Sequence, residues 1–184
     1  MRRTKLISAL SLSCAGALLA TAAFAASPGH GNRDRDTFKV PLQGFQEVPV
    51  VLTSGSGELR LTINEAAGTI AYELGYGGLE GNVTQAHIHI GQANVAGGIS
   101  LWLCQTTASP APAAVTATTP TCPGPNSGNV TGNLTAASVI GPAGQGVVAG
   151  QLGDVITAIR AGKAYGNVHT TVVPSGEIRG QLVQ

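Results

Sequence analysis

Two short segments of strictly alternating polarity constrain the fold more than any other feature of the chain. In residues 58–63 (ELRLTI), Leu59, Leu61 and Ile63 alternate with polar residues, and residues 69–74 (TIAYEL) repeat this pattern. Successive side chains of a β-strand point to opposite faces, so each segment is expected to bury one side. Residues 64–68 provide a turn between them, and the two segments are therefore predicted to form a β-hairpin.

Short strand-like segments continue to the end of the chain, separated by Gly-Gly and Pro-Ser-Gly turns. They are residues 85–90, 100–104, 129–135, 164–170 and 177–182. Many short strands at this spacing indicate an all-β domain, either a β-sandwich or a barrel. One short helix interrupts the pattern: Asp154 is its expected N-cap, Val155, Ile156 and Ile159 its apolar side, and Gly162 its stop.

The first 25 residues have the pattern of a secretory signal peptide. Arg2, Arg3 and Lys5 precede an uncharged apolar run over residues 6–22, and Ala23-Phe24-Ala25 fits a signal-peptidase site. The alternative is an uncleaved anchor, but this run is at the short end of the spanning range. Cleavage would remove Cys14. The predicted division is a signal peptide over residues 1–25, a flexible arm over 26–36 and one domain over 37–184, in a secreted or periplasmic protein.

The charge of the processed chain excludes several classes of partner. Seven basic and nine acidic residues remain after residue 25, which leaves a net charge of −2. Such a chain lacks the basic field that nucleic acid requires and has no polybasic patch for anionic lipid. No second apolar run is long enough to span a bilayer, so no membrane span is expected after cleavage.

Cys104 and Cys122 are the two cysteines that remain after cleavage. In an oxidising compartment an even pair is typical of a disulfide. Their spacing matches no zinc motif. The pair is therefore predicted to be a disulfide that closes the Pro-, Ala- and Thr-rich segment 105–121, stabilising the fold by about 3 kcal/mol on loop-closure arguments.

Four segments together resemble the CHRD domain, which is named after the animal protein chordin and also occurs in secreted bacterial proteins. They are LQGFQEVP at 42–49, AHIHIG at 86–91, YGNVHT at 165–170 and GEIRGQL at 176–182. The resemblance covers residues 37–184. It implies an immunoglobulin-like or Greek-key β-sandwich or barrel in an extracellular setting. It implies no defined chemistry, and because the chain lacks the cysteine-rich modules of chordin, growth-factor binding is not carried over.

His87, His89 and His169 are the candidate functional residues. His87 and His89 share one face of their strand, opposite Ile88 and Ile90, and His169 is opposite Val168. Two interpretations stay open. If the strands are neighbours, the three imidazoles form a site for copper or zinc, since neutral imidazole suits both metals. Alternatively, the histidines belong to an architectural hydrogen-bond network with Glu177 or Arg179.

Enzyme signatures are weak in this sequence. No Gly-x-Ser-x-Gly motif is present, and no pair of carboxylates is marked out for glycosidase chemistry. The leading hypothesis is thus a non-enzymatic extracellular or periplasmic module for binding or structure, whose partner is an unknown extracellular ligand or protein. The alternative is a metalloprotein that uses the three histidines.

Overall fold

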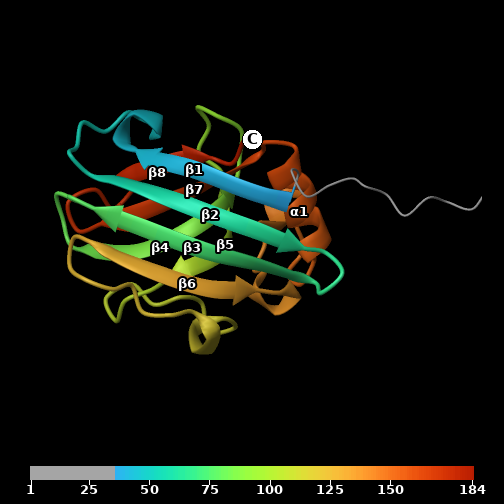
Figure 1. The fold of residues 1–184 in the computed structure, drawn as a ribbon. Coiled ribbons are helices and arrows are strands. Elements are labelled where there is room, and N and C mark those ends of the chain that lie inside the picture. The colour runs from blue at the N-terminus through green and yellow to red at the C-terminus, as the bar shows by residue number, and fades with distance from the viewer. Residues whose placement is uncertain (1–35) are drawn as a thin grey trace, which may run out of the picture. The chain divides into compact units, whose positions relative to one another are not determined.

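The computed structural model describes residues 36–184. The predicted signal peptide and nearly all of the predicted arm, with Cys14 and His30, lie outside the described residues and stay predictions. Eight strands and one α-helix form the described part (Figure 1): β1 (Thr37–Gln43), β2 (Ser56–Asn64), β3 (Thr69–Gly77), β4 (Val83–Ile90), β5 (Gly98–Cys104), β6 (Gly128–Leu134), α1 (Leu152–Arg160), β7 (Ala164–Thr170) and β8 (Ile178–Gln181).

All eight strands belong to one antiparallel sheet with the order β5-β4-β7-β8-β1-β2-β3-β6. The sheet curls so that β1, β2, β3 and β6 lie in front of β4, β5, β7 and β8, and it nearly closes into a barrel (Figure 1). The hydroxyl of Tyr72 on β3 donates a hydrogen bond to the Leu103 carbonyl on β5, 2.6 Å away, which connects the two layers. The predicted all-β class is confirmed.

The barrel interior holds the apolar residues that the alternation predicted. Leu59 and Leu61 of β2, Ile70 and Leu74 of β3, and Ile88 of β4 are fully buried. Strand β1 has the same pattern, with Phe38, Val40 and Leu42 buried between exposed neighbours. This strand is absent from the predicted set, although its period of two is as clear as that of the hairpin.

Helix α1 lies at the end of the barrel opposite the β3–β4 connection (Figure 1). Val155, Ile156 and Ile159 are buried as predicted, and Gly162 has a positive φ of 66° just beyond the helix. The predicted N-cap is wrong: the N-cap is Gln151, three residues earlier, and Asp154 lies in the first turn of the helix. An acidic residue there still favours the helix, because it faces the positive end of the helix dipole.

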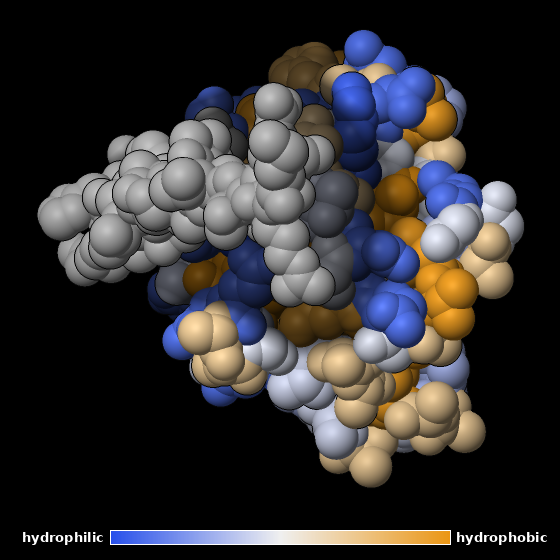
Figure 2. Space-filling model, turned by 90° about the vertical axis from the view of Figure 1, so that its right-hand side faces the viewer, coloured by the Kyte–Doolittle hydropathy of each residue, from blue (hydrophilic) through white to orange (hydrophobic). Residues whose placement is uncertain are grey.

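Figure 2 views the domain from the α1 side, where hydrophilic and hydrophobic residues are mixed on the visible surface. No helix in residues 36–184 is long and apolar enough to cross a membrane.

The predicted disulfide between Cys104 and Cys122 is present. It joins the end of β5 to the base of segment 105–121. Ala111 and Val115 of this segment pack on Trp102 of β5 in a small apolar cluster outside the barrel. The disulfide thus fixes a cover over the outer face of β5.

Candidate metal centre

The site lies on the outer face of the layer formed by β5, β4, β7 and β8. Antiparallel pairing aligns residues of these four strands in rows. One row runs Trp102, His87, Asn167, Arg179, and a second brings His89 beside Tyr165. His169 is paired with Gln85 in the next row. Ala86, Val168 and Ile178 form the corresponding row on the core side. Strand alternation therefore places the three histidines on one face, as predicted.

That outer face is not solvated. His87, His89 and His169 are 0%, 7% and 6% exposed. His87 contacts Trp102 in a T-shaped arrangement with ring centroids 4.2 Å apart, and segment 105–121 covers Trp102. The backbone carbonyl of Gly97 lies within hydrogen-bonding distance of His89, and that of Pro174 within hydrogen-bonding distance of His169. The face of the sheet that carries the histidines is thus a second buried layer beneath loops.

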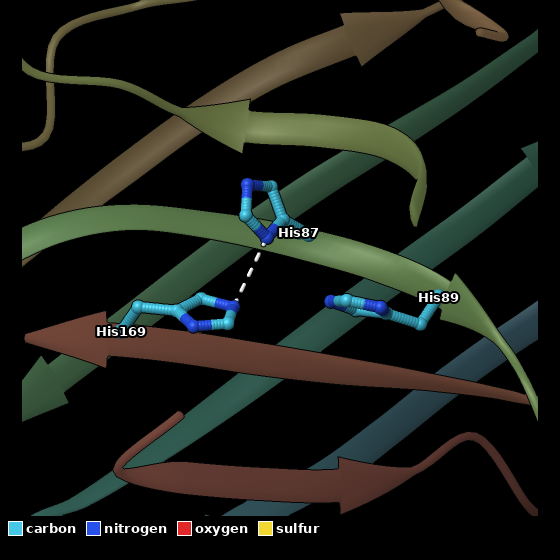
Figure 3. Close-up of side chains that lie close together, drawn as sticks. All are labelled: His87, His89 and His169. Carbon is cyan, nitrogen blue, oxygen red and sulfur yellow. Dashed lines mark hydrogen bonds between the residues drawn. The ribbon is translucent and has the colours of Figure 1, made fainter. Parts of the chain in front are cut away.

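The three imidazoles point toward one another (Figure 3). One ring nitrogen of each lies within 4.8 Å of the corresponding nitrogen of the other two. Nδ1 of His87 and Nε2 of His169 are hydrogen-bonded at 3.1 Å, and His89 directs a ring nitrogen toward this pair. Within residues 36–184 this is the group of ligand-type side chains that meets at one point.

Backbone carbonyls fix the protonation of two rings. His89 Nδ1 lies 3.0 Å from the Gly97 oxygen, and His169 Nδ1 lies 2.9 Å from the Pro174 oxygen. A carbonyl only accepts, so both Nδ1 atoms carry the proton and both Nε2 atoms of the neutral rings present a lone pair. His87 Nδ1 then donates to His169, while the buried Nε2 atoms of His87 and His89 have no hydrogen-bond partner.

All three rings are held neutral at physiological pH. Burial lowers the pKa of His87 to about 2 and that of His89 to about 4, with further lowering by the neighbouring histidines. Burial also lowers the pKa of His169, against an opposing effect of its bond to Pro174. Metal ions bind neutral imidazole, so no proton needs to be removed from a charged ring before binding.

The geometry fits a metal after a small adjustment. Two nitrogens bound tetrahedrally to one zinc at about 2.0–2.1 Å lie about 3.3 Å apart, close to the present His87–His169 separation. His89 has to approach by at most about 1.5 Å to reach the same ion. The bonds from His89 and His169 to carbonyls are of the kind that orients metal-binding histidines. His87 would bind through Nδ1 and carry its proton on Nε2.

A buried stack of side chains flanks His89. The Tyr165 ring is parallel to that of His89, with centroids 4.7 Å apart, and the Arg179 guanidinium carbon lies 3.4 Å from the Tyr165 centroid. Arg179 is 2% exposed and donates to the Gln92 carbonyl.

Asn167, between His87 and Arg179, donates to the buried Glu47 carboxylate. Burial raises the pKa of Glu47 to about 7, although Arg179 and Asn167 oppose the shift.

Glu177 does not lie with the histidines. It directly precedes β8, and its carboxylate accepts hydrogen bonds from the Thr53 hydroxyl, the Thr170 hydroxyl and the Glu80 amide, each at 2.7 Å. Thr170 is on the strand face opposite His169. The expected hydrogen bond between Glu177 and a histidine is therefore not formed, and Glu177 instead connects two loops, at Thr53 and Glu80, to the end of β7. Arg179 is the residue of this pair that lies near the site.

Four further residues shape the site and had not been proposed for it: Tyr165, Asn167, Trp102 and Glu47. Tyr165 and Asn167 alternate with His169 in one strand, so the period of two alone identifies them. Trp102 and Glu47 come from other segments, and only the strand order and the path of the loop after β1 bring them here.

The depressed histidine pKa values predict acid destabilisation. An unfolded histidine takes up a proton near pH 6.5, whereas the folded rings do so only at lower pH, so the free energy of unfolding falls on acidification through this window. Glu47 acts in the opposite sense: its stabilising contribution is present below about pH 4.5 and is lost as pH rises through about 7. Because up to three histidine protons oppose one carboxyl proton, we expect a net loss on the order of 3 kcal/mol between pH 6.5 and 4.5.

Urea denaturation at several pH values measures this loss. In the variant His87→Gln, the decrease in the free energy of unfolding between pH 6.5 and 4.5 should be smaller by the contribution of one histidine. A stability that is flat across this window in the unmodified protein would show that the buried histidines do not resist protonation.

Comparison with known families gives one finding. The family model for the CHRD domain matches residues 38–182, nearly the whole described chain. Comparison with curated proteins and with solved structures found no match. CHRD domains are extracellular or periplasmic modules, and the disulfide between Cys104 and Cys122 fits that setting.

Proposed function

The chain belongs to the CHRD family, and on that premise we propose that this domain is a metal-binding module that holds one copper or zinc ion between His87, His89 and His169. The observation that carries the proposal is the convergence of three buried, neutral imidazoles from β4 and β7, two of them already oriented by backbone carbonyls. We further propose export through residues 1–25, so that the module acts outside the cytoplasm.

The free-energy cost of burying a histidine nitrogen without a hydrogen-bond partner favours a bound metal. A buried polar atom without a hydrogen bond costs about 1–3 kcal/mol. The Nε2 atom of His89, which faces the other two rings, is in this state. A metal at the centre would use the His89 lone pair and replace the proton shared by His87 and His169. Because the site is closed, the metal has a binding or structural role, and no catalytic step is proposed.

The competing role is purely architectural. The His87–His169 hydrogen bond joins β4 to β7, and the bonds to Gly97 and Pro174 hold two loops in place. Both roles require the histidines for full stability, so loss of stability alone does not distinguish them. Metal uptake does, because the architectural role predicts none.

The single tryptophan of the chain gives a direct signal for metal binding. Trp102 lies 4.2 Å from the His87 ring, so Cu²⁺ bound at this site should quench its fluorescence. We expect quenching to saturate at one equivalent in untagged protein freed of metal. The same equivalent should raise stability, by about 2.7 kcal/mol when the free ion is at a hundred times its Kd.

His89→Ala should abolish both effects, and His30→Ala serves as the matched control because His30 is the fourth histidine that remains after residue 25. Equal binding by His89→Ala and the unmodified protein would place the metal elsewhere. A folded protein that takes up neither copper nor zinc would leave the architectural role.

A further inference from the structure

The ligand group carries no negative charge. It consists of three imidazoles, and within residues 36–184 no carboxylate or thiolate joins it. An ion bound there keeps its whole charge in a buried environment. The free-energy cost of burying an ion rises with the square of its charge, so a dication costs about four times as much to desolvate as a monocation of the same size.

A fixed positive charge lies close to the ligand group, separated from His89 by one aromatic ring. The Arg179 guanidinium lies on the Tyr165 ring, and that ring stacks on His89. Glu47 is the buried carboxyl group that faces Arg179, and its raised pKa of about 7 means that it offsets the charge only in part at neutral pH. Repulsion of a dication by Arg179 is twice that of a monocation.

The number of available ligands also disfavours Zn²⁺ at this site. Zinc sites in proteins are four-coordinate, with water or an anion where only three side chains bind. Here the ligand nitrogen Nε2 of His89 is shielded from solvent, and His87 is fully buried. Cu⁺ has a filled d shell and is stable with three nitrogen ligands, so it needs no further group.

We propose that the three-histidine centre selects monovalent copper, Cu⁺, over Zn²⁺, because its ligands are neutral, its surroundings are closed and Arg179 adds positive charge beside it. This selectivity rests on the metal site proposed above.

Competition with chromophoric chelators tests the selectivity on untagged, exported protein. Cu⁺ is supplied with ascorbate under anaerobic conditions, and Zn²⁺ is measured separately in the same buffer. We expect the Kd for Cu⁺ to be at least about a hundredfold lower than that for Zn²⁺, the ratio that about 2.7 kcal/mol of differential charge repulsion gives. Zinc that binds as tightly as Cu⁺, or more tightly, would overturn the selectivity and leave the metal site standing. Absence of binding by either ion would overturn both proposals.

Substitutions at Arg179 separate charge from packing. Arg179→Met removes a repulsion that is twice as large for Zn²⁺ as for Cu⁺, so the fold-gain in Zn²⁺ affinity should be the square of the fold-gain in Cu⁺ affinity. A gain of about tenfold for Cu⁺ would accompany a gain of about a hundredfold for Zn²⁺. Arg179→Lys keeps the charge and should leave the ratio of the two affinities within about threefold. Glu47→Gln removes the partly compensating carboxylate and should shift the ratio further toward Cu⁺, which provides a test even if Arg179→Met does not fold. A ratio that stays constant across the folded variants would contradict the role of Arg179.

Discussion

Replacing Leu61 with aspartate is expected to unfold the domain. Leu61 is fully buried between Phe38 of β1 and Tyr72 of β3, so the substitution places an unpaired charge in the barrel interior. We expect a loss of more than about 4 kcal/mol, which is a large part of the stability of an ordinary domain. Circular dichroism and urea denaturation measure the loss.

The neighbouring residue gives a matched control. Thr62 is exposed and follows Leu61 in the same strand, so Thr62→Asp should cost less than about 1 kcal/mol. If Leu61→Asp and Thr62→Asp behave alike, the assignment of faces in β2 is incorrect, and with it the register of the hairpin.

Glu177→Ala is expected to have the second-largest effect. Its carboxylate is fully buried and is the common acceptor for Thr53, Thr170 and the amide of Glu80. Removal leaves these donors without their acceptor, and we expect a loss of about 3–5 kcal/mol in the free energy of unfolding.

Glu80→Ala is the control for this prediction. Glu80 is an exposed carboxylate that accepts hydrogen bonds from Ser54, so its removal should cost about 1 kcal/mol or less. The folded fraction of Glu177→Ala should keep its metal stoichiometry, because Glu177 does not contact the histidines. A small stability loss combined with a lost metal would instead place Glu177 in the site.

Period-two alternation predicts the strands and their faces well because each strand has an apolar side that the barrel interior requires. The alternation predicts strands over residues 58–63 and 69–74, and the structure has them as the central part of β2 and the first part of β3. The same rule separates His87 and His89 from Ile88 and Ile90. Which strands become neighbours is not contained in the pattern, and the β4–β7 pairing is what brings His169 to the other two histidines.

The surroundings of the site depend on loops, which alternation does not describe. Loops bury the face that carries the histidines, and segment 105–121 covers Trp102 because Ala111 and Val115 pack on the indole. Continuing the alternation of β8 by one residue predicts that Glu177 lies on the same face as Arg179. The chain turns there instead, with Gly176 at a φ of 126°, and directs the carboxylate toward Thr53 and Thr170.

X-ray absorption at the metal edge tests the three-histidine centre most directly. In protein loaded with one equivalent of Cu⁺ or Zn²⁺, we expect a shell of three nitrogen neighbours at about 2.0–2.1 Å with the outer-shell scattering typical of imidazole. The pattern should be lost in His89→Ala and kept in His30→Ala. A first shell of oxygen alone, or an unchanged spectrum in His89→Ala, would contradict the centre formed by His87, His89 and His169.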